Sequence, residues 1–239
     1  MQVFAKTDIG RERKQNEDSY YIANEEDKVQ LFMVADGMGG YNAGEVASKM
    51  AIDEVKKYID KHFQKNKDNI EELLVNAIEN ANSAIYKKAE KNKELKGMGT
   101  TLDVSLIYNS KVYIGHIGDS RVYRIRKDFM RRLTKDHSYV QTLIEDGTIT
   151  KEEAFNHPKK NMITKALGCN GKVEPDVYVK TFIKNDILLM TSDGLTNMIK
   201  EDEIFNIIKE DKENAVNKLV EKANDNGGYD NITVVIIMK

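Results

Sequence analysis

The chain contains very little cysteine, no long hydrophobic run and almost no excess of charge of either sign. Cys169 is the single cysteine, which excludes an intrachain disulfide framework and any zinc site built from several cysteines. The 37 basic residues nearly balance the 39 acidic ones. The basic cluster from Arg121 to Arg132 has acidic neighbours, so we interpret it as a solvated surface and expect no nucleic-acid partner.

Targeting and membrane segments are also missing from the sequence. No run approaches the roughly 18 apolar residues that a membrane-spanning helix requires. Residues 1–10 lack the basic segment and apolar stretch that mark a signal peptide. We therefore expect a cytoplasmic protein without membrane association. The hydrophobic fraction of 40% supports a sizeable core, and no repeat or low-complexity linker divides the chain, so we expect one domain over residues 1–239.

Strand-like and helix-like patterns alternate in blocks along the chain. Strand signals occur at both ends, and the two long helical stripes lie between them, which favours two antiparallel sheets covered by helices over a doubly wound parallel sheet. Residues 100–133 read as an antiparallel meander. The expected strands are 2–8, 19–23, 29–35, 100–108, 111–117, 121–126, 130–133, 173–182, 187–191 and 231–238, and the expected helices start at Glu45 or cover 70–85, 139–146 and, as a pair, 201–224.

The periodic pattern weakens between His137 and Gly171. A short helix there is followed by polar residues and Pro158, which is typical of a segment that lies over a domain rather than in its core. We call residues 137–171 the flap and expect it to be an excursion from the main fold.

Three aspartates border strongly apolar strands. Asp36 follows residues 31–35, Asp193 follows 187–191, and Asp230 precedes 232–237. Each Asp-Gly dipeptide by itself is most often an ordinary turn. If the three side chains converge, however, their mutual repulsion requires a cation, and an all-oxygen site suits Mg²⁺ or Mn²⁺ better than Zn²⁺.

Six short segments, spread over nearly the whole chain, resemble the bacterial branch of the protein phosphatase 2C family. The resemblance implies an αββα sandwich, an α+β fold in which a pair of helices flanks each of two antiparallel sheets. It also implies a metal centre at one end of the sheets and phosphoserine or phosphothreonine proteins as substrates. The segments are Gly10-x-x-Arg13-x-x-Asn16-Glu17-Asp18, Asp36-Gly37-Met38-Gly39-Gly40, Gly99-Thr100-Thr101, Gly118-Asp119-Ser120-Arg121, Ser192-Asp193-Gly194 and Gly228-Tyr229-Asp230-Asn231.

The resemblance assigns a metal-binding role to five positions. Asp36 would bridge two Mn²⁺ or Mg²⁺ ions, the carbonyl of Gly37 would bind one of them, and Asp193 with Asp230 would complete the other. Asp119 matches the position associated with a third ion, shared with Asp193; its alternative is a turn carboxylate that binds backbone amides. A water that bridges the two ions would attack phosphorus directly, with no phosphoenzyme.

Other matched positions would act on the phosphate or on water. Arg13 corresponds to the arginine that grips substrate phosphate through its planar fork, and an ordinary surface ion pair is the alternative. Glu17, Asp18 and Asn231 would lie behind the ligands and order bound water rather than bind metal.

The sequence departs from the family at positions that concern proton transfer and charge. Many bacterial members carry histidine where this chain has Tyr41, and animal members carry one where it has Met38. This leaves His116, His137 or a bound water as the proton donor, although a histidine in either place is more often structural. Lys165 stands where relatives usually have arginine, which keeps the charge but loses the fork.

Two other functions are consistent with parts of the pattern. A phosphoprotein-binding adaptor without activity would keep the fold, but intact Asp36, Asp193 and Asp230 argue against it. A nuclease would use a similar two-metal site, but the chain has no strongly basic groove. The resemblance further implies phosphorylated proteins as partners, including a cognate serine/threonine kinase, and a monomer.

Overall fold

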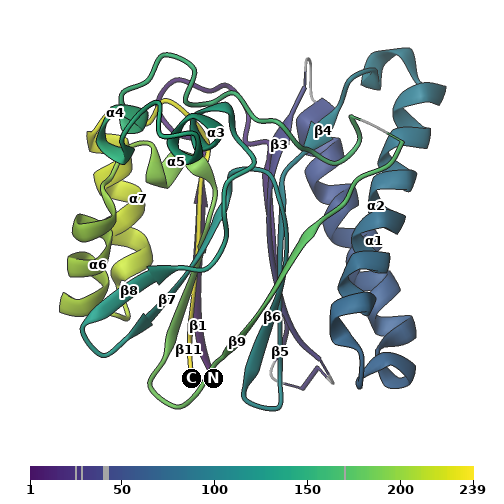
Figure 1. The fold of residues 1–239 in the computed structure, drawn as a ribbon, viewed down its shortest axis with the longest axis horizontal. Helices are drawn as coiled ribbons and strands as arrows, with labels where there is room; N and C mark the ends of the chain where they lie inside the picture. The colour runs from purple at the N-terminus through teal and green to yellow at the C-terminus, as the bar shows by residue number, and fades with distance from the viewer. Residues whose placement is uncertain (25, 28, 40–42, 170) are drawn as a thin grey trace.

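The computed structural model describes residues 1–24, 26–27, 29–39, 43–169 and 171–239. Two antiparallel sheets stack face to face, and a pair of longer helices covers the outer face of each (Figure 1). This arrangement confirms the predicted αββα sandwich and its α+β class.

The two sheets divide the chain unevenly. The first sheet has the order β1-β11-β10-β7-β8, and the second has the order β2-β3-β5-β6-β9, with β4 paired to the end of β3. The strands of the first sheet are β1 (Gln2–Asp8), β7 (Arg121–Arg126), β8 (Phe129–Arg132), β10 (Ile187–Thr191) and β11 (Ile232–Met238). Those of the second are β2 (Asp18–Ile22), β3 (Gln30–Met38), β4 (Gly99–Thr100), β5 (Leu102–Tyr108), β6 (Lys111–Ile117) and β9 (Asp176–Thr181).

Helices cover the sheets and one end of the sandwich. The second sheet lies under α1 (Ala43–Asn66) and α2 (Ile70–Lys91), and the first lies under α6 (Glu201–Glu210) and α7 (Ala215–Asp225) (Figure 1). The short helices α3 (Tyr139–Glu145), α4 (Lys151–Phe155) and α5 (Asp193–Thr196) lie together at the upper end in Figure 1. A 3₁₀ turn, η1 (Lys93–Leu95), follows α2.

The alternation of side chains along the central strands explains the layers. In β3, Leu31 and Met33 pack beneath α1 and α2, whereas Phe32 and Val34 pack between the two sheets. β11 follows the same rule, because its successive residues belong alternately to the core under α6 and α7 and to the core between the sheets. Strands that are apolar on both faces are therefore covered on both faces, as their composition requires.

Two sequence-based expectations about the strands are wrong. The predicted meander does not form, because β6 pairs with β5 and β9 in the second sheet while β7 pairs with β8 and β10 in the first. Residues 118–120 carry the chain from one sheet to the other, a step that side-chain alternation cannot reveal. The strand around Leu31 also does not stop at Asp36, since Gly37 and Met38 pair with Thr100 and Gly99.

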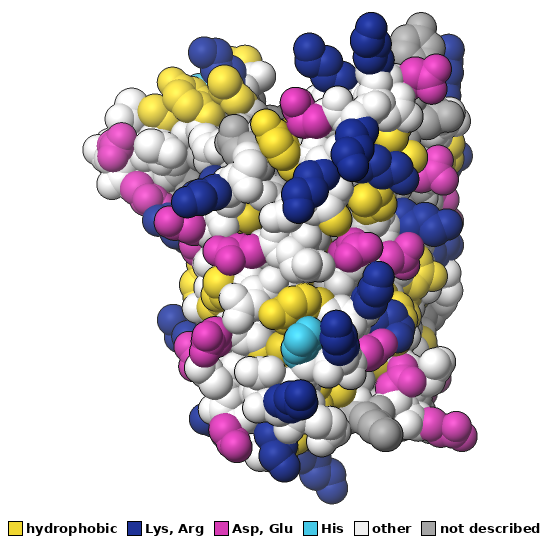
Figure 2. All heavy atoms as spheres, turned by 90° about the vertical axis from the view of Figure 1, so that its right-hand side faces the viewer, with side chains coloured by type: hydrophobic (Ala, Val, Ile, Leu, Met, Phe, Trp, Pro, Cys, Tyr) yellow, Lys and Arg dark blue, Asp and Glu magenta, His cyan; other side chains and the backbone are white. Residues whose placement is uncertain are grey.

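Smaller differences lie in the later part of the chain. β9 starts at Asp176 rather than at Val173, because Pro175 has no N–H to donate to a strand ladder. The predicted helix at 139–146 is confirmed as α3, while α4 and α5 were not predicted. No helix in the described ranges combines the length and apolar character needed to cross a membrane. The outer face of α1 and α2 mixes basic and acidic side chains (Figure 2).

The packing of α2 on the second sheet gives a first prediction. Leu74 is fully buried there, so Leu74→Ala should lower the free energy of unfolding by about 2–5 kcal/mol through lost contacts and a cavity. Urea denaturation measures this change. Glu71→Ala, on an exposed face of the same helix, should change stability by less than about 0.5 kcal/mol. Equal effects of the two substitutions would contradict the assigned core.

Candidate functional site

Strand ends bring five aspartates to the same end of the sandwich. Asp36 lies within β3, Asp18 begins β2 directly opposite it, and Asp193 is the first residue of α5 after β10. Asp230 precedes β11, and Asp119 lies in the crossing between the two sheets. The structure therefore brings the predicted ligands Asp36, Asp193, Asp230 and Asp119 into one region.

The backbone of Asp36 is held by the segment Gly99-Thr100-Thr101. The Asp36 carbonyl accepts hydrogen bonds from the Thr100 hydroxyl and the Thr101 amide, both at 2.9 Å. The Asp36 amide donates to the Thr101 hydroxyl, also at 2.9 Å. These three bonds fix the peptide groups on both sides of Asp36.

Gly37 is required by close backbone packing rather than by a turn. A β-carbon at this position would lie 2.2 Å from the Gly44 carbonyl oxygen and 2.5 Å from that of Glu17. Only glycine lets the end of β3, the start of α1 and the Glu17 peptide approach so closely.

The buried carboxylates repel one another strongly. Burial, followed by the charges of Asp18 and Asp193, raises the pKa of Asp36 well above its usual range. Burial raises the pKa of Asp18 to about 7, although hydroxyl hydrogen bonds oppose the rise. Burial and then the charge of Asp230 raise the pKa of Asp193 to about 6. Burial and then the charge of Asp193 raise the pKa of Asp119 well above its usual range. Each of these groups would be stabilised by a nearby positive charge.

Two of the carboxylates have an oxygen without a partner. Asp18 accepts hydrogen bonds on one oxygen from Ser192 at 2.8 Å and Thr233 at 2.7 Å, while its other oxygen is buried and unpaired. Asp193 likewise accepts from Asn197 at 2.8 Å and leaves its second oxygen buried and unpaired. Crowded, unpaired carboxylate oxygens fit the preference of Mg²⁺ and Mn²⁺ for hard oxygen donors. As these side chains stand, no three His, Cys, Asp or Glu groups among the described residues form a ready-made cluster.

Arg13 forms an ion pair with one of the predicted ligands. Its guanidinium donates to Asp230 at 2.7 Å, and half of the Arg13 side chain, 50%, remains exposed. Burial lowers the pKa of Arg13, but attraction to Asp230, Asp36 and Glu17 outweighs burial and raises it. An ion pair was the alternative role for Arg13, yet here the pair places the guanidinium at the acidic centre.

Asn231 supports the loop that carries Arg13. The side-chain nitrogen of Asn231 donates to the backbone carbonyl oxygens of Ile9 and Gln15, both at 2.9 Å. Its side-chain oxygen accepts from the backbone amide of Glu17 at 2.8 Å. The Glu17 carbonyl in turn accepts from Ser48 at 2.6 Å. Asn231 thus closes residues 9–17 into a fixed shape, a contact set that the sequence did not predict.

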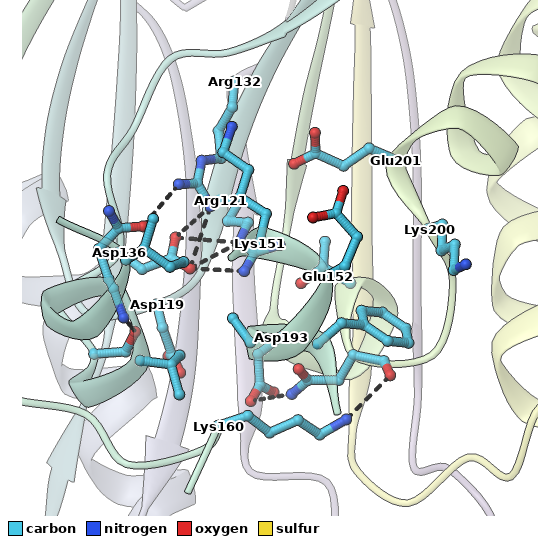
Figure 3. Close-up of a pocket in the computed structure, with 18 of the residues that line it drawn as sticks. Asp119, Arg121, Arg132, Asp136, Lys151, Glu152, Lys160, Asp193, Lys200 and Glu201 are labelled. Carbon is cyan, nitrogen blue, oxygen red and sulfur yellow. Dashed lines mark hydrogen bonds and ion pairs between the residues drawn. The ribbon is translucent and has the colours of Figure 1, made fainter. Parts of the chain in front are cut away.

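A cavity of about 910 Å³ adjoins Asp119 and Asp193 (Figure 3). Its walls come from α3 and α4 of the flap, from β8, and from the segment between α5 and α6. The side-chain nitrogen of Asn197 donates to the Asp193 carboxylate and, at 3.3 Å, to the side-chain oxygen of Asn161 in the flap. Lys160 of the flap donates to the backbone carbonyl oxygen of Asn197 at 3.4 Å. The flap therefore lies beside the acidic centre and contacts the helical turn that carries Asp193.

The two histidines considered as proton donors have other partners. His116 is fully buried, with one ring nitrogen 2.6 Å from Asp103 and the other 2.9 Å from the Lys135 carbonyl. His137 accepts from the Gly118 amide at 3.1 Å, and burial lowers its pKa to about 4. Neither histidine has a contact with Asp36, Asp193 or Asp230 among the interactions of the described residues.

The structure describes two of the three positions at which the sequence departs from the family. Lys165 lies 3.9 Å from Asp176, the first residue of β9. Met38 is the last residue of β3. Tyr41 lies outside the described residues.

Solved structures with the same fold define the class of this protein. The Mycobacterium tuberculosis serine/threonine phosphatase PstP/Ppp superimposes with a TM-score of 0.90 at 36% identity, covering 98% of this chain and 97% of the other. The Streptococcus agalactiae serine/threonine phosphatase gives a TM-score of 0.90 at 35% identity, covering 100% and 99%. The fold is that of a serine/threonine protein phosphatase.

Sequence comparison identifies the family within that class. A family model described as protein phosphatase 2C matches residues 10–226. The serine/threonine phosphatase Stp of Listeria innocua is 43% identical over 235 residues, 97% of this chain and 93% of the Listeria protein. The protein phosphatase PhpP of Streptococcus pneumoniae is 37% identical over 242 residues, covering 99% and 97%. The chain belongs to the protein phosphatase 2C family, as the six motifs predicted.

The raised pKa values predict how the metal-free protein responds to pH. Between about pH 4 and pH 7 the folded protein binds protons at Asp18 and Asp193 that the unfolded chain, with a pKa near 3.8, has released. Stability should therefore fall as pH rises through this window. Thermal unfolding in EDTA should show a lower midpoint at about pH 8 than at about pH 5.

Variants separate this effect from other titrations. Asp18→Asn should reduce the pH dependence, because the amide cannot lose a proton, whereas Asp53→Asn on the exposed face of α1 should leave it unchanged. A midpoint that rises with pH in both the parent and Asp53→Asn would contradict the assigned repulsion.

Proposed function

We propose that this protein is a manganese- or magnesium-dependent phosphatase that hydrolyses phosphoserine and phosphothreonine in proteins by direct attack of water. The convergence of buried carboxylates with unpaired oxygens at one end of the sandwich is the observation that supports this proposal most strongly. A structure of the phosphatase PstP, 35% identical with a TM-score of 0.87, is in complex with two manganese ions. We further propose a single-domain, monomeric, cytoplasmic enzyme.

The residues of the acidic centre divide the work of holding the cations. Asp36, the Gly37 carbonyl, Asp193 and Asp230 would hold two ions, and Asp119 with Asp193 would hold a third. When bound, the ions would supply an activated water and neutralise charge on the phosphate. The Thr100 and Thr101 bonds keep the backbone of Asp36 in place, so only its side chain would adjust when a cation binds.

Residues around the ligands would orient water and substrate. Asp18, with one buried oxygen free, and Glu17 would accept hydrogen bonds from water in the centre. Asn231 would act mainly by holding residues 9–17. Arg13 is half exposed and carries several donors, so it could bind two phosphate oxygens while it faces Asp230.

The leaving alkoxide requires a proton, and we assign its donation to water. His116 and His137 are engaged with Asp103, Lys135 and Gly118, and neither touches the ligands. A buried histidine whose pKa is near 4 is also a poor proton donor at neutral pH because it is seldom protonated.

The decisive experiment measures phosphate release from a phosphothreonine peptide. The parent should be active with Mn²⁺ or Mg²⁺ and inactive in EDTA, and Asp36→Asn and Asp193→Asn should each lose more than about 100-fold, because even groups that only support a ligand contribute about 10–100-fold. Asp53→Asn is the matched control and should retain activity. A folded parent that releases no phosphate with either metal would favour the phosphoprotein-binding adaptor instead.

The flap gives a separate prediction about substrates. Residues from α4 line the cavity beside Asp193, so replacing residues 147–158 by a short glycine-serine linker should alter preference among phosphopeptides by removing that wall. Activity on para-nitrophenyl phosphate, which is too small to span the cavity, should persist. Equal losses on both kinds of substrate, in a variant that unfolds cooperatively, would count against the flap as a specificity element.

We also propose that a serine/threonine kinase of the same cell is among the substrates. The motivation is the bacterial branch signature at residues 36–40. Incubation of the phosphorylated kinase with this enzyme, followed by mass spectrometry of its phosphosites, tests the pairing; unchanged phosphorylation would remove this partner.

A further inference from the structure

The loop between β1 and β2 presents several cations beside the acidic centre. Residues 11–15 are all exposed, and among them Arg11, Arg13 and Lys14 are basic while only Glu12 is acidic. Arg13 is paired with Asp230, but neither Arg11 nor Lys14 forms an ion pair or a side-chain hydrogen bond among the described residues. Two positive charges next to the candidate phosphate-binding arginine are thus left without a partner.

The conformation of this loop is fixed by hydrogen bonds to its backbone. The Gly10 amide donates to Asp8 at 2.9 Å, and Asn231 holds the carbonyls of Ile9 and Gln15. The Arg11 amide donates to the Gly228 carbonyl at 2.7 Å, which joins the loop to the segment before Asp230. Backbone bonds therefore set the positions from which the Arg11 and Lys14 side chains extend.

Two glycines place an aromatic side chain on the same surface. Gly227 and Gly228 have φ values of +126° and +53°. A β-carbon at Gly227 would lie 2.8 Å from the ring of Tyr229, and one at Gly228 would lie 2.9 Å from Cγ of Arg11. The Tyr229 ring and the aliphatic part of Arg11 thus pack against Gly227 and Gly228, where a side chain would clash. Tyr229 remains 63% exposed. We name Arg11, Lys14 and Tyr229 the basic rim.

We infer that the basic rim recognises acidic or additionally phosphorylated residues that flank the phosphoserine or phosphothreonine of the substrate. The inference rests on the proposed function, since Arg13 would hold the phosphate and the rim adjoins Arg13 in the same loop. Glu12 and Asp225 are exposed acidic side chains of the adjoining segments, and neither forms an ion pair with Arg11 or Lys14 among the described residues, so they offset the charge of the rim without pairing its cations. Tyr229 offers a flat face against which a flanking residue packs.

The size of the effect follows from the exposure of the charges. Exposed ion pairs contribute about 1.4- to 5-fold each in binding, so two pairs should favour an acidic substrate by about 2- to 25-fold. A flanking phosphate should lie at the upper end of this range, because it carries nearly two charges and three acceptor oxygens. The preference should shrink with salt, since the screening length falls from about 30 Å at 0.01 M to about 3 Å at 1 M.

The experiment compares kcat/KM for three phosphothreonine peptides that differ only beside the phosphoresidue: neutral, acidic, or carrying a second phosphoserine. The parent should prefer the acidic and doubly phosphorylated peptides, and Arg11→Gln/Lys14→Gln should remove that preference while keeping activity on the neutral peptide and on para-nitrophenyl phosphate. Tyr229→Ala should weaken all three peptides but not para-nitrophenyl phosphate. Lys57→Gln/Lys61→Gln removes the same charge from exposed positions on α1, a helix of the opposite layer, and should change nothing.

The outcomes separate the rim from the function on which it rests. Equal kcat/KM for the three peptides in the parent, or a preference that survives Arg11→Gln/Lys14→Gln, overturns the rim. A preference lost equally in Lys57→Gln/Lys61→Gln shows that net charge and not the rim sets it, and overturns the rim as well. Loss of activity on para-nitrophenyl phosphate in the parent would instead overturn the proposed function.

Discussion

Mutual repulsion among buried carboxylates is the constraint on which the rest of this structure depends. Asp18, Asp36, Asp119 and Asp193 lie close together with little contact with solvent, and burial raises the pKa of each. Placing such groups together lowers the free energy of unfolding of the cation-free protein. The same repulsion raises the affinity of the site for a cation, because a bound cation relieves it. The surrounding contacts keep the carboxylates from separating, because Asp36 is locked through its backbone and Asp18 through two hydroxyls.

The sandwich suits this task because its parts meet at one end. Asp36 comes from the second sheet, whereas Asp193 and Asp230 come from the first, so the relative position of the sheets sets the distance between the ligands. The core between the sheets, with Phe32, Val34 and Val235, fixes that position. A substitution in this core would therefore change the distances between the aspartates without altering any residue of the site.

The sequence predicted the fold class and the aspartates that the fold brings together better than it predicted the contacts that hold them. Asp36, Asp193 and Asp230 were detectable because each borders a run of buried strand residues, and the family motifs added Asp119 and Arg13. The meander was wrong because β6 and β7 show the same alternation whether they lie in one sheet or two. Asn197, which joins Asp193 to the flap, carried no periodic signal, since a polar contact between distant segments leaves none in the sequence.

The position of β11 affects the order in which the first sheet can form during synthesis. β11 lies between β1 and β10, with Gln2 opposite Met238 on one side and Ile187 opposite it on the other. During synthesis β1 must therefore wait for the much later β11, and until β11 is made β1 cannot join β10 in the first sheet. Because Asp230 and Asn231 precede β11, a partly synthesised chain has neither a complete sheet nor a complete acidic centre. The first sheet and the acidic centre are therefore completed at the same stage of synthesis.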